Sequence, residues 1–231
     1  MKATQFTWLG HATWKIESEG SVIILDPFFD ENPAATVKAS EVKADYLLIS
    51  HGHFDHVADA ASIASRCDAT VIANYEIATW LGKQGVQKTI GMNLGGQVTL
   101  PFGKLKLVPA WHSSTLPDGS SGGSPGGFVL TLHDGTVYFA CDTALFSDMK
   151  LIGDMEIDLF VCPIGDIFTM GPDDALKAVE FVGPRKVAPS HYNTWPPIEQ
   201  DAKSWADRVK SKTQAQPIVR KVGEAFGFSD E

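Results

Sequence analysis

The chain has few cysteines, no long apolar run and no cluster of basic residues, and each absence excludes a class of protein. Its three cysteines, Cys67, Cys141 and Cys162, are odd in number and widely spaced in 231 residues, unlike the disulfide framework of a small secreted domain. No stretch approaches the roughly 20 apolar residues that span a membrane, and the first residues lack the pattern of a signal peptide. We therefore expect reduced thiols, a cytoplasmic protein and no membrane partner.

Positive charge is also scarce. The chain carries 19 lysines and arginines against 28 aspartates and glutamates, a formal net charge of −9, so most of its surface would repel a nucleic-acid backbone. We expect a small-molecule substrate and no nucleic-acid partner. Hydrophobic residues make up 44% of the chain, enough for a substantial core. No repeat, charge block or long linker interrupts the sequence, which predicts one domain over residues 1–231.

Short apolar runs alternate with helical patterns along the chain. They predict strands over 5–9, 13–17, 22–25, 46–49, 70–73, 105–110, 128–132, 137–140, 158–162 and 186–188, and helices over 59–65, 76–81, 172–182 and 197–209. The first three strands are spaced as an antiparallel meander, and the later ones follow an α/β rhythm. The pattern indicates an α/β (α+β) fold.

Directly after the predicted strand 46–49, the sequence reads Ser-His-Gly-His-Phe-Asp-His. His51, His53, Asp55 and His56 are four groups that bind transition metals, all within six positions. Only seven histidines occur in the chain, and a surface loop seldom collects three of them by chance. The segment therefore predicts a metal site.

Three further candidate ligands each follow a predicted strand of their own: His112, Asp142 and His191. Alone, each is weak evidence, because a histidine or aspartate after a strand is more often a structural residue. Loops at strand ends converge while the strands hold them rigidly, so we expect the three to join the first motif in one pocket. His133 is not a candidate ligand, because a predicted hairpin turn at 133–135 explains it without a metal.

Together with Asp26, these residues form an ordered set that resembles the metallo-β-lactamase superfamily. Finer matches at Gly10-His11-Ala12, 142–146, 163–165, 170–172 and 191–194 are similar to the poorly characterised metal-dependent hydrolases related to L-ascorbate-6-phosphate lactonases. The resemblance implies a four-layer αββα sandwich, in which two mixed sheets pack face to face with helices outside and the metal site lies at one edge.

The resemblance also implies a ligand set, with Asp142 bridging two divalent ions. It assigns one ion to His51, His53 and His112, the other to Asp55, His56 and His191, and a position behind the ligands to Asp26. Zinc is the expected metal, although manganese and iron accept the same ligands. Two such ions share a water, and a bridging hydroxide forms at neutral pH.

Two more residues are candidates for catalysis besides Asp142. His11 lines the pocket or contacts substrate, or else it is a histidine satisfied by backbone groups nearby. Tyr192, next to His191, offers a phenol that could donate a hydrogen bond to an oxyanion, but the sequence does not fix the direction of its side chain. The glycine-rich segment 119–127 is interpreted as a flexible connector. Aromatic residues close in sequence to the ligand loops could form an apolar rim: Phe28, Phe29, Trp111, Phe168 and Trp195.

Three functions fit these residues. The favoured one is a binuclear metal-dependent hydrolase in which a metal-bridging hydroxide attacks a small-molecule ester, lactone or phosphodiester. The first alternative is an iron-dependent oxidoreductase on the same scaffold, against which the complete second ligand set argues. The second is a non-catalytic metal-binding module, which would have closed coordination.

Overall fold

The first part of the chain builds one mixed sheet, to which the last strand, β14, is added at the edge. A computed structural model describes residues 2–230. The strands of this sheet, in spatial order, are β14 (Ala225–Gly227), β1 (Gln5–Trp8), β2 (Trp14–Ser18), β3 (Ser21–Leu25), β4 (Tyr46–Ile49), β5 (Thr70–Asn74) and β6 (Thr89–Met92). From β14 to β3 neighbouring strands are antiparallel, and from β3 to β6 they are parallel. The predicted opening meander is therefore present.

The second sheet also has an antiparallel part and a parallel part. Its strands, in spatial order, are β13 (Gln216–Pro217), β12 (Lys186–Ser190), β11 (Leu159–Pro163), β10 (Thr136–Phe139), β9 (Gly126–Thr131), β8 (Gly103–Pro109) and β7 (Gln97–Leu100). Pairs from β7 to β10 are antiparallel and pairs from β10 to β13 are parallel. Parallel neighbours require crossover connections, and these supply the helices.

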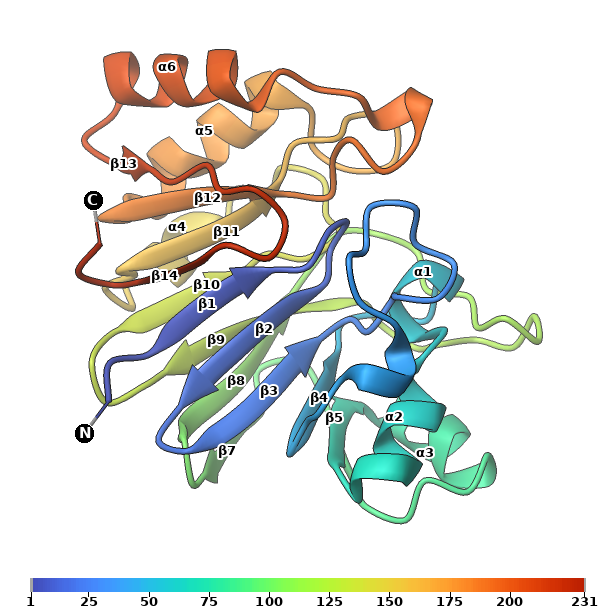
Figure 1. Ribbon diagram of the computed structural model, residues 1–231. Helices are drawn as coiled ribbons and strands as arrows, with labels where there is room; N and C mark the ends of the chain where they lie inside the picture. The colour runs from blue at the N-terminus through green and yellow to red at the C-terminus, as the bar shows by residue number, and fades with distance from the viewer. Residues whose placement is uncertain (1, 231) are drawn as a thin grey trace.

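Helices cover the outer face of each sheet, which gives the expected αββα layers (Figure 1). On the first sheet lie α1 (Phe54–Val57), α2 (Ala60–Cys67) and α3 (Tyr75–Lys83), and on the second lie α4 (Met149–Gly153), α5 (Pro172–Val182) and α6 (Ala202–Lys212). Two short 3₁₀ turns, η1 (Ala39–Glu41) and η2 (Pro196–Ile198), complete the fold. Within residues 2–230 no helix is long and apolar enough to cross a membrane.

The core fills the space between the sheets with aromatic side chains from both. Phe6 of one sheet and Phe139 of the other are fully or almost fully buried, with ring centroids 6.4 Å apart, and Trp14 lies 6.1 Å from Phe139. Burying one such side chain contributes roughly 1.5–3 kcal/mol. A face packed this way fixes the strand ends in space, and those ends carry the site.

The last helix begins later than predicted. It starts at Ala202 rather than at 197, because Asp201 accepts the Ser204 N–H at 3.0 Å and caps the helix there. Glu199, directly after the 3₁₀ turn η2, has an extended backbone, so η2 does not continue into helix α6. Four strands and two helices were not predicted, namely β6, β7, β13, β14, α1 and α4. β6 and β7 are largely exposed and lack an apolar run, so their pairing partners rather than their composition define them.

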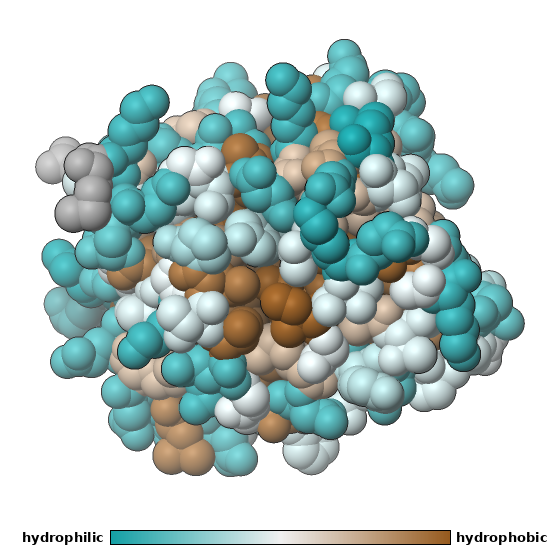
Figure 2. Space-filling view, turned by 90° about the horizontal axis from the view of Figure 1, so that it is seen from below, coloured by the Kyte–Doolittle hydropathy of each residue, from teal (hydrophilic) through white to brown (hydrophobic). Residues whose placement is uncertain are grey.

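Turned by 90°, the molecule presents a mostly hydrophilic surface with a group of apolar residues near its middle (Figure 2). The candidate ligands lie at the edge where β4, β8, β10 and β12 end, on the side of α1 in Figure 1.

Candidate metal centre

The candidate ligands reach the site from strand ends whose backbone turns sharply. His11, Asp26, Cys141 and His191 follow β1, β3, β10 and β12 within one to three residues, and all have positive φ, between 45° and 55°. Non-glycine residues rarely adopt this left-handed region. Four such residues at one edge indicate that the packed sheets hold the site in a strained conformation.

One carboxylate oxygen lies at the centre of the site. Asp142 Oδ2 is 3.0 Å from His191 Nε2, 3.4 Å from His56 Nε2, 3.7 Å from His112 Nε2 and 4.0 Å from His51 Nε2. Asp142 is 3% exposed. A buried carboxylate that faces four imidazoles is well arranged to bridge two cations.

On one side of Asp142, three histidines converge. The ligand atoms of His51, His53 and His112 all lie within 4.8 Å of one another. His51 is fully buried, whereas the other two are partly exposed. His51 Nε2 and His53 Nδ1 are 2.9 Å apart, and Ser113 Oγ lies 3.2 Å from His53 Nε2. This trio therefore has one side against the core and one side open to solvent.

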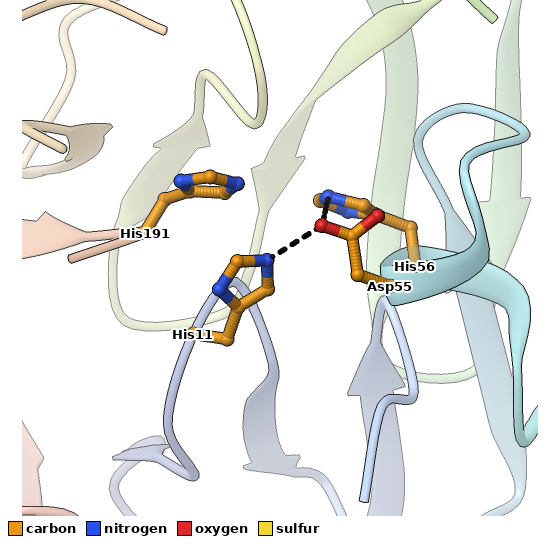
Figure 3. Close-up of side chains that lie close together, drawn as sticks. All are labelled: His11, Asp55, His56 and His191. Carbon is orange, nitrogen blue, oxygen red and sulfur yellow. Dashed lines mark hydrogen bonds and ion pairs between the residues drawn. The ribbon is translucent and has the colours of Figure 1, made fainter. Parts of the chain in front are cut away.

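On the other side, Asp55, His56 and His191 converge together with His11 (Figure 3). Their ligand atoms also lie within 4.8 Å of one another. His11 Nε2 is 3.0 Å from Asp55 Oδ2, and His11 Nδ1 is 2.9 Å from Thr194 Oγ1. His11 thus touches the metal-binding candidates directly, while its second nitrogen is held by a buried hydroxyl.

Behind the ligands, Asp26 holds two neighbours, Ser50 and His56. Its Oδ2 accepts the Ser50 hydroxyl at 2.6 Å and lies 2.8 Å from His56 Nδ1, and its Oδ1 accepts the Ser50 N–H at 2.8 Å. Ser50 Oγ also lies 3.0 Å from His51 Nδ1. A carboxylate on the far nitrogen of an imidazole fixes the ring orientation and makes the other nitrogen a better ligand. Asp26 therefore lies behind His56 and orients its ring.

Burial and mutual repulsion keep most of these imidazoles neutral. Burial, reinforced by His191, lowers the pKa of His11 to about 4. Burial and the neighbouring His56 hold the pKa of His51 well below its usual value, and burial also lowers the pKa of His53 and of His112. Neutral imidazole is the form that binds a metal.

The carboxylates of the site have lowered pKa values. Burial would raise the pKa of Asp142, but His191 and His56 outweigh it and hold that pKa well below the usual value. The pKa of Asp55 is lowered against burial by His56 and by the hydrogen bond from His11. Burial would likewise lower the pKa of His56, but Asp142, Asp26 and Asp55 raise it well above its usual value. The carboxylates are therefore ionised and ready to bind cations.

The donor set fits divalent cations. Within the described part of the chain, His56 Nε2 and Asp142 Oδ1 are buried with no hydrogen-bond partner. Buried polar atoms are nearly always paired, so unpaired ones that belong to an imidazole and a carboxylate are the state expected of metal ligands. Imidazole and carboxylate suit zinc, manganese and iron.

Some candidates lie outside this cluster. Tyr192 stacks on Trp8, with centroids 4.9 Å apart, and lines a separate cavity, which does not favour its predicted role as an oxyanion donor. His133 lies in the hairpin turn between β9 and β10, 3.5 Å from Glu19 and away from the site, as predicted. Sequence patterns carried no signal for the hydroxyls of Ser50 and Thr194, which contact site residues only through the fold.

The glycine-rich segment is packed against the protein rather than behaving as a flexible connector. Asn74 Nδ2 donates to the Gly122 carbonyl at 2.6 Å, and the Gly126 N–H donates to the Ser50 carbonyl at 3.0 Å. A Cβ on Gly122 would come within 2.4 Å of Ser114 Oγ, whose hydroxyl also accepts the Gly52 N–H. The segment therefore supports the loop that carries His51 and His53.

The metal-ligand cluster opens onto a cavity of about 790 Å³. Its polar lining includes His53, Asp55, His112, Asp142 and His191, and its apolar lining includes Phe54, Pro117, Ile167, Phe168, Trp195 and Pro197. Of the predicted rim residues, Phe168 and Trp195 line the cavity. Phe28 and Phe29 are buried and Trp111 is exposed, and none of the three lines the cavity.

Comparison with known proteins agrees with this geometry. A family model described as beta-lactamase superfamily domain matches residues 22–192. A UPF0173 metal-dependent hydrolase from Thermus thermophilus is 48% identical over 205 residues, covering 89% of this chain and 91% of that protein. The solved structure of a novel metallo hydrolase from the archaeon Ignicoccus hospitalis is 32% identical, with a TM-score of 0.89 and 100% of both chains covered. A metallo-beta-lactamase fold protein from Bacillus subtilis, 14% identical, matches with a TM-score of 0.74 over 97% of this chain and 99% of that one. It shares the fold.

Proposed function

The chain belongs to the UPF0173 family of metal-dependent hydrolases in the metallo-β-lactamase superfamily, and we propose that it uses two divalent ions to hydrolyse a small-molecule ester, lactone or phosphodiester. The observation that carries this proposal is the position of Asp142 Oδ2, within 4.0 Å of four histidines that belong to two separate ligand groups. A carboxylate that reaches both ligand groups is well placed to bridge two neighbouring ions.

We assign the ligands as the two groups suggest. The first ion takes His51, His53 and His112, the second takes Asp55, His56 and His191, and Asp142 belongs to both. Ions held by these residues would supply a nucleophilic hydroxide at neutral pH and would polarise the carbonyl or phosphoryl oxygen of the substrate. Zinc is our first expectation for both positions.

The residues of the chain orient these groups and move protons. Asp142 Oδ1, buried and without a partner among residues 2–230, is free to accept the proton of the attacking water. Asp26 holds His56 through Nδ1 and so presents Nε2 to the cluster. His11 acts on Asp55 rather than on substrate, since both of its ring nitrogens are already hydrogen-bonded.

Two observations weigh against the alternative functions. A mononuclear iron oxidoreductase does not need the second group of Asp55, His56 and His191. A non-catalytic metal module has no use for a cavity of about 790 Å³ lined by four of the proposed ligands and the bridging carboxylate. Among the three bond types, a lactone agrees best with the resemblance to lactonases, whatever the rest of the substrate carries.

The test measures metal content and hydrolysis in matched variants. We expect about two zinc or manganese ions per chain and hydrolysis of simple lactones or phosphodiesters. Asp142→Asn keeps the fold and loses most of the activity, on the order of 10²-fold or more. His133→Ala, which removes a histidine outside the site, retains both ions and full activity. Full activity in Asp142→Asn would refute the bridging role, and a single iron per chain would favour the oxidoreductase.

A further inference from the structure

One flank of the cavity is apolar although it is exposed. Phe54, Ile167 and Phe168 are 50%, 67% and 52% exposed, and all three line the cavity that contains the metal-ligand candidates. Single exposed apolar residues are ordinary on protein surfaces. Several around one cavity mark a binding site.

This apolar flank is continuous with the polar centre. The Trp195 ring lies 4.9 Å from the His11 ring and 6.2 Å from the Phe54 ring, between centroids. A molecule whose reacting bond lies at the ligands must therefore place its adjoining part against Trp195 and its neighbours. The cavity, at about 790 Å³, is in the size range of small-molecule sites.

The backbone is strained where it presents this surface. Asp166 and Ile167 are consecutive and have φ of 65° and 50°, and a β-branched residue in this region is a genuine outlier. The Asp166 carboxylate accepts the Ile167 N–H at 2.8 Å, and the Met170 N–H donates to the Thr143 carbonyl, next to Asp142, at 3.0 Å. Strain that the surroundings hold in place is typical of ligand-binding segments.

No cationic side chain lies in this cavity. Among the described residues that line it there is neither a lysine nor an arginine, whereas Asp55 and Asp142 contribute negative charge. The bound ions would be the positive charge of the site, and they face the reacting bond. An anionic group elsewhere on the substrate would lose its solvating water on binding and would find no cation to replace it, which costs binding free energy.

We infer that the substrate is an uncharged ester or lactone whose reacting bond adjoins an apolar chain or ring, seated between Ile167, Phe168 and Trp195. This inference rests on the proposed hydrolase function and narrows it. A phosphorylated sugar lactone is the opposite case, because its phosphate would meet the apolar flank.

Two series of compounds test this on the metal-loaded protein. In the first, lactones with alkyl substituents of increasing length are hydrolysed. Full burial of a methylene is worth about fourfold, so we expect kcat/KM to rise at least tenfold over four methylenes. In the second, lactones of equal length end in a methyl or in a phosphate group, and we expect the methyl-ended compound to be preferred at least tenfold. No rise with length, or a preference for the phosphate, overturns the inference.

A variant links the preference to the flank. Ile167→Asn replaces a strained β-branched residue by one that tolerates positive φ, so the fold is retained or stabilised while the apolar contact is lost. We expect the dependence on chain length to weaken several-fold. The matched control is Leu151→Asn, because Leu151 on α4 is also 67% exposed but lies outside the cavity. Equal effects of the two variants would refute the role of the flank.

Binding of unreactive compounds tests the apolar substrate site separately from the proposed hydrolase function. Straight-chain amides from acetamide to hexanamide are titrated into the protein, and the Kd is followed by calorimetry. A Kd that falls with length in the wild type and not in Ile167→Asn supports the apolar site, even if no ester or lactone is hydrolysed, in which case the hydrolase proposal fails by itself. A Kd independent of length overturns the apolar site whatever the activity.

Discussion

Replacing Thr194 by valine tests whether His11 positions Asp55. Nε2 of His11 faces the ionised Asp55 carboxylate and must carry the proton, so Nδ1 accepts the Thr194 hydroxyl at 2.9 Å. Thr194→Val conserves the shape and removes that donor. His11 is fully buried, and leaving one of its nitrogens unpaired costs about 1–3 kcal/mol of stability.

The metal affinity should change as well. With its own partner lost, His11 no longer fixes Asp55, and losing such an outer contact typically weakens metal binding about 10- to 100-fold, or about 1.4–2.8 kcal/mol. We expect this loss for one of the two ions, the one assigned to Asp55, His56 and His191. The assay titrates metal against a competing chelator and measures unfolding by denaturant of the metal-free protein.

The chain offers two controls for this experiment. Thr7→Val removes a buried hydroxyl that has no hydrogen-bond partner within residues 2–230, so it should leave both stability and metal affinity unchanged or slightly improved. Thr194→Ser keeps the hydroxyl and should bind both ions with wild-type affinity. If Thr194→Val is destabilised yet binds both ions with wild-type affinity, the contact is merely structural and His11 does not position Asp55.

The two remaining predictions concern the core. Tyr138 is fully buried, its hydroxyl has no partner among the described residues and burial raises its pKa, so Tyr138→Phe should keep or raise the free energy of unfolding by up to about 2 kcal/mol. A loss of more than that would reveal a partner for the hydroxyl. Burial also raises the pKa of the Cys162 thiol, so alkylation at pH 8 should modify the partly exposed Cys67 and reach Cys162 only after unfolding. Rapid labelling of Cys162 in the native protein would contradict this.

Elements with strong local signals were predicted well from the sequence. Helix α5 was predicted at its observed bounds because proline begins it, Asp173 and Asp174 occupy its first turn, and Gly183 ends it with φ of 59°. α6 was misplaced because its N-terminus depends on the Asp201 cap, which competes with two preceding prolines that also resemble a helix start.

The candidate ligands could be found because each follows a strand, and strands of a sandwich end together at one edge. The contacts among them could not be found. His11 and Thr194 are 183 residues apart and meet only in the folded protein. The positive φ of His191 and Ile167 could not be predicted, because neither residue is a glycine. Strain of this kind is imposed by tertiary packing.

The site therefore divides into two parts that depend on different elements. Most ligands follow the ends of packed strands, and Asp55 and His56 lie on α1, whereas most of the apolar flank lies on connecting segments around Pro117, Phe168 and Trp195. Phe54, at the start of α1, is the flank residue next to a ligand. A substitution on the flank removes contact with one part of the substrate and leaves Asp142 and its histidines in place. Substrate choice should consequently respond to changes in these segments without loss of bound metal. A flank variant that released an ion would show instead that the two parts form one unit.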